Sequence, residues 1–281
     1  MQIGVVGAGT MGAGIAEVFA TTEGCQVILT DTSTALAAGG RQRIVDHLTG
    51  QVAKGRLDRA VADTAIGRVR VGELAALADC DLVIEAIVER IEVKRDLFGR
   101  LDELCRPSTI LASNTSSLSI TEIARGLAHP VVGMHFFNPA PVMGLVEVIA
   151  GATTPEETVS RVTDLAVRVG KTPVRVREAA GFVVNRILIP MINEAIGVVA
   201  DGTASIEDVD TAMKLGANHP IGPLALGDLV GLDVVLAIME VLQAETGDPK
   251  YRPHPLLRTY VRAGWLGRKS GRGFHVYQGK Q

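Results

Sequence analysis

The chain has few cysteines and no recognisable cluster of metal ligands. Its 281 residues contain three cysteines, Cys25, Cys80 and Cys105, which lie far apart and without metal-ligand spacing. Such usage is typical of a reducing compartment and excludes a disulfide scaffold. We therefore expect a cytoplasmic protein with no metal site.

The chain also lacks a strong net charge and a long apolar run. The net charge is −3, so no nucleic-acid partner is expected. No apolar run reaches the roughly 18 residues of a membrane span without a charge or a breaker. Met1 leads directly into an expected strand instead of a signal peptide. We therefore expect no membrane partner, and the 47% of hydrophobic residues predicts a large buried core.

A glycine-rich hexapeptide, GAGTMG, lies between an expected strand at residues 3–6 and an expected helix at about residues 13–22. A second expected strand ends at Asp31, at the spacing of about 20 residues that dinucleotide-binding motifs show. The hexapeptide comprises Gly7, Ala8, Gly9, Thr10, Met11 and Gly12.

Each part of this motif has a physical reason. Gly7 permits a tight turn, Gly9 lets backbone amides approach a pyrophosphate, and Gly12 lets the helix pack closely on the strand. The helix N-terminus adds positive potential for the phosphates. The Asp31 carboxylate can accept hydrogen bonds from both ribose hydroxyls and would repel a 2′-phosphate. We therefore expect NAD(H), while Thr32 is compatible with either cofactor and leaves NADP(H) open.

Residues 131–149, VVGMHFFNPAPVMGLVEVI, predict a strand, a turn and a second strand. The central Asn-Pro-Ala-Pro segment cannot continue a β-ladder. His135 ends the first apolar run, and Glu147 lies inside the second. A lone carboxylate is costly to bury unless something pairs with it, and an imidazole paired with a carboxylate is a better general base. From this stretch alone, an exposed Glu147 and a structural His135 are the alternative.

The pattern of the chain changes near residue 178. Short apolar segments alternate with helical patterns up to an expected last strand at residues 173–177. From Phe182 onward helical patterns predominate. We therefore predict a Rossmann-type, doubly wound α/β domain at residues 1–178 and an all-α domain at residues 179–281.

Small polar residues follow an expected strand in the first half, at residues 113–117. The carboxyl edge of a parallel sheet is where such residues commonly meet a ligand. Helix capping is the alternative, and Ser119 before Glu122 has the pattern of a capping box.

The second half is expected to contain an unbroken helix from Pro223 to about Ala244 and a short strand at its end. Its helices are too apolar to be left exposed, so we expect a homodimer through this half, with packing inside one chain as the alternative.

Together these stretches resemble the 3-hydroxyacyl-CoA dehydrogenase family, and within it the bacterial 3-hydroxybutyryl-CoA dehydrogenases. The resemblance covers essentially the whole chain. It is carried by GAGTMG at 7–12, IEAIVER at 84–90, SNTSSLSIT at 113–121, HFFNPAPVMGLVEVI at 135–149, GFVVNRILIPMINEA at 181–195, KLGANHPIGPLALGDLVGLD at 214–233 and GRKSGRGF at 267–274.

By this resemblance, His135 and Glu147 are the catalytic pair. Ser116 would hydrogen-bond the 3-oxygen of the substrate, and Asn185 would contact the same oxygen or the thioester region. Lys54 matches a coenzyme A contact, with Arg56 as a second candidate. On the cofactor side the resemblance implies Asp31 at the adenine ribose, and nearer the nicotinamide half it implies Glu89, Lys94, Ser116, Asn138 and Lys269.

The implied reaction interconverts an (S)-3-hydroxyacyl-CoA, such as 3-hydroxybutyryl-CoA, and the 3-ketoacyl-CoA by hydride transfer with NAD(H). Two other functions stay open: a dehydrogenase of a free 3-hydroxy acid or sugar acid, and a nucleotide-binding structural protein without catalysis. The basic residues within 41–59 favour a coenzyme A substrate over a free acid. The intact set of Ser116, His135, Glu147 and Asn185 argues against a structural protein.

Overall fold

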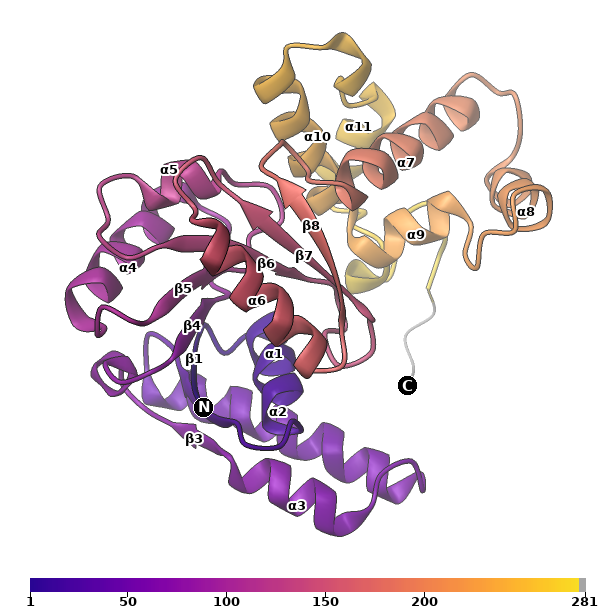
Figure 1. The fold of residues 1–281 in the computed structure, drawn as a ribbon. Helices are drawn as coiled ribbons and strands as arrows, with labels where there is room; N and C mark the ends of the chain where they lie inside the picture. Colours follow the sequence, from indigo (N-terminus) through magenta and orange to yellow (C-terminus); the bar gives the residue numbers. More distant parts are fainter. Residues whose placement is uncertain (278–281) are drawn as a thin grey trace. The chain divides into compact units, whose positions relative to one another are not determined.

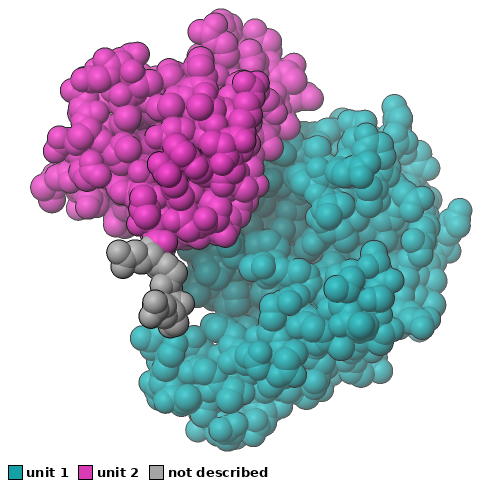
Figure 2. Space-filling view, turned by 180° about the vertical axis from the view of Figure 1, so that it is seen from behind, with its two compact units in different colours: residues 1–179 teal, residues 180–281 magenta. Residues whose placement is uncertain are grey.

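The computed structural model describes residues 1–277, and the chain forms two compact units, residues 1–179 and 180–281 (Figure 2). The first unit is built on an eight-stranded sheet with the strand order β3-β2-β1-β4-β5-β6-β7-β8 (Figure 1). The strands are β1 (Gln2–Val6), β2 (Gln26–Thr30), β3 (Val69–Val71), β4 (Leu82–Glu85), β5 (Ile110–Ser113), β6 (Val131–Phe136), β7 (Leu145–Ala150) and β8 (Thr172–Arg177).

Neighbouring strands of this sheet are parallel except for the antiparallel pair β6 and β7. The chain winds outward from β1 in both directions, which is the doubly wound arrangement. The predicted α/β fold is therefore confirmed. The helices of this unit are α1 (Thr10–Ala20), α2 (Thr34–Ala53), α3 (Arg59–Gly67), α4 (Ile91–Leu104), α5 (Ile120–Ala124) and α6 (Glu156–Arg168), with a 3₁₀ turn at Leu74–Leu77.

The buried core of the first unit identifies the strand residues that face each side of the sheet. Alternate strand residues such as Ile84, Ala112 and Met134 pack in one buried cluster with apolar residues of α1, α2 and α6. Successive side chains of a strand point to opposite faces of the sheet. The residues between them therefore face the other side, where α4 and α5 lie (Figure 1).

Capping residues set the helix starts locally. Asp58 caps α3 by accepting a hydrogen bond from the Ala60 amide, so α2 and α3 are two separate helices that form a helical pair. Ser119 caps α5 by accepting from the Glu122 amide at 3.0 Å. The capping alternative for this serine is thus correct.

The second unit is helical over its described residues, as predicted, and has its own apolar core. That core includes Ile192, Leu232 and Met239, none of which has exposed surface. The helices are α7 (Val184–Ala200), α8 (Ile206–Gly216), α9 (Pro223–Val230), α10 (Leu232–Thr246) and α11 (Pro255–Arg262), with 3₁₀ turns at Pro249–Tyr251 and Arg268–Ser270.

Two expectations for the second unit are wrong. The helix expected from Pro223 to about Ala244 is broken into α9 and α10 at Gly231, whose φ of 102° is incompatible with a right-handed helix. The expected terminal strand is replaced, within the described residues, by isolated bridges that join Arg272 to Gly267 and Val276. A glycine-rich segment folds back on itself here and finds no partner strand with which to extend a ladder.

Within residues 1–277, no helix combines the length and apolarity needed to cross a membrane. In the same range, no group of three or more His, Cys, Asp or Glu residues is arranged to hold a metal ion.

Candidate active site

The glycine-rich hexapeptide joins β1 to α1, and its geometry requires glycine. A Cβ on Gly12 would lie 1.7 Å from the carbonyl oxygen of Gly7, and Gly7 itself has a φ of 97°. Around Gly9, in contrast, nothing lies within 4 Å of the position of a Cβ. The first turn of α1 has no side-chain cap, so its amide groups are available to an anion. These residues fit the pyrophosphate of a dinucleotide.

Asp31 ties this loop to the end of β2. Its Oδ2 accepts a hydrogen bond from the Ala8 amide at 2.7 Å, and its Oδ1 accepts from the Thr32 amide at 2.7 Å. A carboxylate offers about four acceptor positions, so capacity remains for ribose hydroxyls. Arg43 of α2 donates to the Ala8 carbonyl. The sequence did not single out this arginine, because helical periodicity says nothing about which loop a helix lies against.

His135 and Glu147 form a buried hydrogen-bonded pair. They lie opposite each other in the antiparallel register of β6 and β7, with His135 Nδ1 2.8 Å from Glu147 Oε2. Glu147 is 0% exposed and His135 is 5% exposed, which rules out the alternative of an exposed glutamate. An ionised carboxylate can only accept a hydrogen bond, so Nδ1 carries the proton and Nε2 is the nitrogen that can act as a base.

Strand register places further polar residues on the same face of the sheet as this pair. Glu85 lies opposite Ser113 in the parallel register of β4 and β5, and the Ser113 hydroxyl donates to Glu85 at 2.7 Å. By strand alternation, both residues face the same side of the sheet as His135 and Glu147. Polar side chains at or near the carboxyl ends of β4, β5 and β6 therefore lie on one face of the sheet.

Glu89 organises the loop that contains Ser116. Its Oε1 accepts hydrogen bonds from the Thr115 hydroxyl at 2.6 Å, the Ser116 amide at 2.9 Å and the Ser117 amide at 3.2 Å. The Ser116 hydroxyl also lies 3.2 Å from this oxygen. Burial raises the pKa of Glu89, but the nearby Lys94 ammonium and these hydrogen bonds outweigh it and hold the pKa below its usual value.

Lys94 lies between two carboxylates. Its Nζ is 2.5 Å from Glu85 and 3.2 Å from Glu89. Lys94 is 1% exposed and Glu85 is 0% exposed, so the Lys94–Glu85 ion pair is buried, whereas the Glu89 side chain is 37% exposed. Glu85 was not predicted from the sequence. A glutamate ending an apolar strand was the signal that could have identified it.

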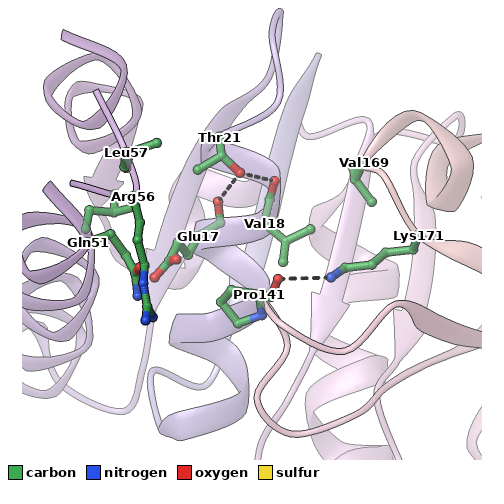
Figure 3. A pocket seen from close by; sticks show the side chains of 10 residues that line it. Glu17, Val18, Thr21, Gln51, Arg56, Leu57, Pro141, Val169 and Lys171 are labelled. Atoms are coloured by element: carbon green, nitrogen blue, oxygen red, sulfur yellow. Dashed lines mark hydrogen bonds between the residues drawn. The ribbon is translucent and has the colours of Figure 1, made fainter. Parts of the chain in front are cut away.

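The remaining candidates of the first unit lie in loops. Asn138 is exposed in the turn between β6 and β7 and precedes Pro139 through a cis peptide bond. Lys54 and Arg56 are exposed between α2 and α3. Arg56, with Glu17 and Lys171, is among the residues lining a hollow of about 230 Å³ (Figure 3).

Two candidates belong to the second unit. Asn185 is the second residue of α7. Lys269 lies in the terminal glycine-rich segment, where its Nζ is 2.5 Å from Asp233.

Among the candidates of the first unit, the structure brings together Glu89, Lys94 and Ser116 in one network and His135 with Glu147 in another.

Comparisons with known proteins identify the family of the chain. Residues 2–179 match the model of the NAD binding domain of 3-hydroxyacyl-CoA dehydrogenase, and residues 181–277 match that family's C-terminal domain. A 3-hydroxybutyryl-CoA dehydrogenase of Clostridioides difficile is 53% identical over 280 residues, which cover 99% of each chain. The crystal structure of (S)-3-hydroxybutyryl-CoA dehydrogenase PaaH1 from Ralstonia eutropha matches with a TM-score of 0.94 and 46% identity, covering 99% of both chains. The chain therefore belongs to the 3-hydroxyacyl-CoA dehydrogenase family.

Proposed function

We propose that the protein interconverts (S)-3-hydroxybutyryl-CoA and acetoacetyl-CoA with NAD(H). The observation that carries this proposal is the buried His135–Glu147 pair at the ligand-binding edge of an NAD-binding sheet. The choice of a four-carbon acyl group is supported by the names of relatives that match over nearly the full chain.

The proposed mechanism assigns one task to each residue. NAD(H), when bound, accepts or supplies the hydride. His135 exchanges the proton of the 3-hydroxyl through Nε2, and Glu147, hydrogen-bonded to Nδ1, stabilises the imidazolium. Ser116, held by Glu89, hydrogen-bonds the 3-oxygen, and Asn185 contacts the same oxygen or the thioester region.

The test is the rate of NADH and NADPH oxidation with acetoacetyl-CoA, with longer 3-ketoacyl-CoAs and with free acetoacetate. We expect the highest kcat/KM with acetoacetyl-CoA and NADH. Comparable rates with free acetoacetate would favour the free hydroxy acid function. No oxidation with any acyl-CoA would favour a structural nucleotide-binding protein.

Lys54→Ala is expected to raise the KM for acetoacetyl-CoA about three- to tenfold and to change the KM for NADH little. The physical reason is the loss of one charge-assisted contact to a coenzyme A phosphate at an exposed site. Binding energy from such a remote contact can also orient the reacting carbon, so kcat is expected to fall too. Steady-state kinetics at low and high salt check this, because salt screens the wild-type contact.

Arg59→Ala is the matched control for Lys54→Ala. Arg59 is a basic residue of the same helical pair, but its guanidinium lies 4.0 Å from Asp63 of the same helix. Its removal is expected to leave the KM for acetoacetyl-CoA unchanged. Equal effects in the two variants would argue against a specific role for Lys54.

Asp31→Ser combined with Thr32→Arg is expected to shift the NADPH/NADH ratio of kcat/KM more than about tenfold toward NADPH. A charge-assisted hydrogen bond of about 1.5–3 kcal/mol to the ribose is lost, and repulsion of a 2′-phosphate is removed. Thr32→Arg alone, which keeps the carboxylate, is the control and is expected to shift the ratio less. A wild type that already prefers NADPH would show that the Asp31 carboxylate does not bind the ribose hydroxyls.

We also propose a cytoplasmic homodimer that associates through the second unit. Apolar side chains exposed on that unit support association: Ile187 is 67%, Leu215 83% and Leu229 53% exposed. Light scattering at micromolar concentration is expected to give twice the mass of the chain, and a monomer would contradict the proposal.

The three cysteines are free, which is consistent with the proposed reducing compartment.

A further inference from the structure

Lys171 has no role in the site described so far, yet its ammonium makes an unusual set of contacts. Its Nζ donates to the carbonyl oxygens of Ala140 at 2.7 Å and Met143 at 2.8 Å, and lies 3.4 Å from that of Pro141 (Figure 3). Lys171 is 9% exposed, and this burial lowers its pKa. A buried ammonium loses its hydrogen bonds to water, and the carbonyl oxygens replace them here.

All three carbonyls belong to the turn between β6 and β7, the strands that carry His135 and Glu147. Lys171 immediately precedes β8, which pairs with β7, and the neighbouring Thr172 amide donates to the Gly144 carbonyl at 2.7 Å. The turn is therefore fastened to the start of β8 at several points. A lysine in a loop after a helix gives no such signal in the sequence.

The opposite side of this turn packs against the helix of the cofactor motif. A Cβ added to Gly14 of α1 would lie 3.2 Å from the Ala140 Cβ and 3.3 Å from the Pro141 Cδ. Ala140 is only 2% exposed. The turn is thus held between α1, which begins at the glycine-rich loop, and the Lys171 ammonium.

We propose that Lys171 is a positioning residue for hydride transfer. By holding the turn against α1, it fixes the positions of Asn138, His135 and Glu147 relative to the cofactor-binding loop. This inference rests on the proposed function. Small errors in the placement of reacting groups lower rates strongly, because about 1 Å of misplacement can cost about 100-fold.

The experiment compares wild type with Lys171→Met, Lys171→Arg and the control Lys250→Met. Lys250 is an exposed lysine whose ammonium pairs with Asp248 on the surface. The measurements are kcat, the KM for acetoacetyl-CoA, the NADH Kd by fluorescence titration, and the isotope effect with NADH deuterated at the transferred position. Circular dichroism confirms that each variant is folded.

Lys171→Met is expected to lower kcat about 10- to 100-fold, to raise the NADH Kd several-fold and to increase the isotope effect, because hydride transfer becomes slower. Lys171→Arg, which keeps the charge and the donors, is expected to recover part of the loss, and Lys250→Met none of these changes. A folded Lys171→Met with wild-type kcat, Kd and isotope effect would overturn the proposal.

Gly14→Ala provides a second variant should Lys171→Met fail to fold. It leaves the buried ammonium in place and displaces the turn from the side of α1, so it is expected to lower kcat and raise the isotope effect as well. Wild-type values in Gly14→Ala would also count against the proposal. If the wild type does not reduce acetoacetyl-CoA, the proposed function fails by itself, and an unchanged NADH Kd in both variants would then overturn the role of Lys171.

Discussion

Replacing His135 by alanine is expected to lower kcat with acetoacetyl-CoA about 10²–10⁴-fold and to leave the NADH Kd unchanged. This is the usual cost of removing one acid–base group. The imidazole is buried, and its Nδ1 is held 2.8 Å from Glu147, so the base and the carboxylate that orients it are removed from one another only by changing His135 or Glu147. Glu147→Gln is expected to lower kcat less and to alter the pH–rate profile, because the imidazolium loses its counter-charge while a hydrogen bond can persist.

The matched control for His135 is His129, which precedes the opposite end of β6. His129 is also buried, and its Nδ1 is also hydrogen-bonded to a carboxylate, that of Asp102, at 2.7 Å. His129→Gln is expected to affect stability but to leave kcat of the folded protein within a few-fold of wild type. Near-wild-type turnover in His135→Ala, or equal losses in the two variants, would refute the catalytic role.

Lys94→Met is expected to reduce the free energy of unfolding by about 3–5 kcal/mol, because it leaves the buried Glu85 carboxylate without its counter-charge. The Nζ of Lys94 lies 2.5 Å from Glu85 and 3.2 Å from Glu89, and Glu85 is completely buried. The Ser116 loop depends on Glu89, so kcat is expected to fall as well. Urea unfolding followed by circular dichroism measures the stability change.

A second change separates charge from packing in this network. Glu85→Gln combined with Lys94→Met removes the buried negative charge and is expected to recover part of the lost stability. A loss below about 1 kcal/mol in Lys94→Met would mean that the Glu85 carboxylate reaches water or takes up a proton at little cost, and the ion pair with Lys94 would then not stabilise this region.

Local patterns predicted most of the fold. The strand, glycine loop and helix at the N-terminus follow from residue order, since the tight turn needs Gly7 and the close packing needs Gly12. The break at Gly231 was not predicted, because an apolar helical pattern continues across it and a φ of 102° is decided by packing. The expected terminal strand was wrong because a strand needs a partner, and no local pattern reports one.

The candidate site was predicted in part. His135 and Glu147 were identified together because a carboxylate inside an apolar run needs a partner, and the structure does place them opposite each other. Glu85 and Lys171 were missed. Their partners lie in other segments, Lys94 and Ser113 for Glu85 and the β6–β7 turn for Lys171.

The sequence by itself determined the α/β and all-α organisation, the dinucleotide-binding loop and the family, because these depend on residues that are near one another in the chain. Only the tertiary structure decided which carboxylate meets which base. Such contacts depend on the register between strands, and a shift of one residue would turn His135 or Glu147 to the opposite face of the sheet. The burial of Lys94 of α4 beside Glu85 and the contact of the Lys171 ammonium with the β6–β7 turn also depend on tertiary packing, and no local periodicity encodes them.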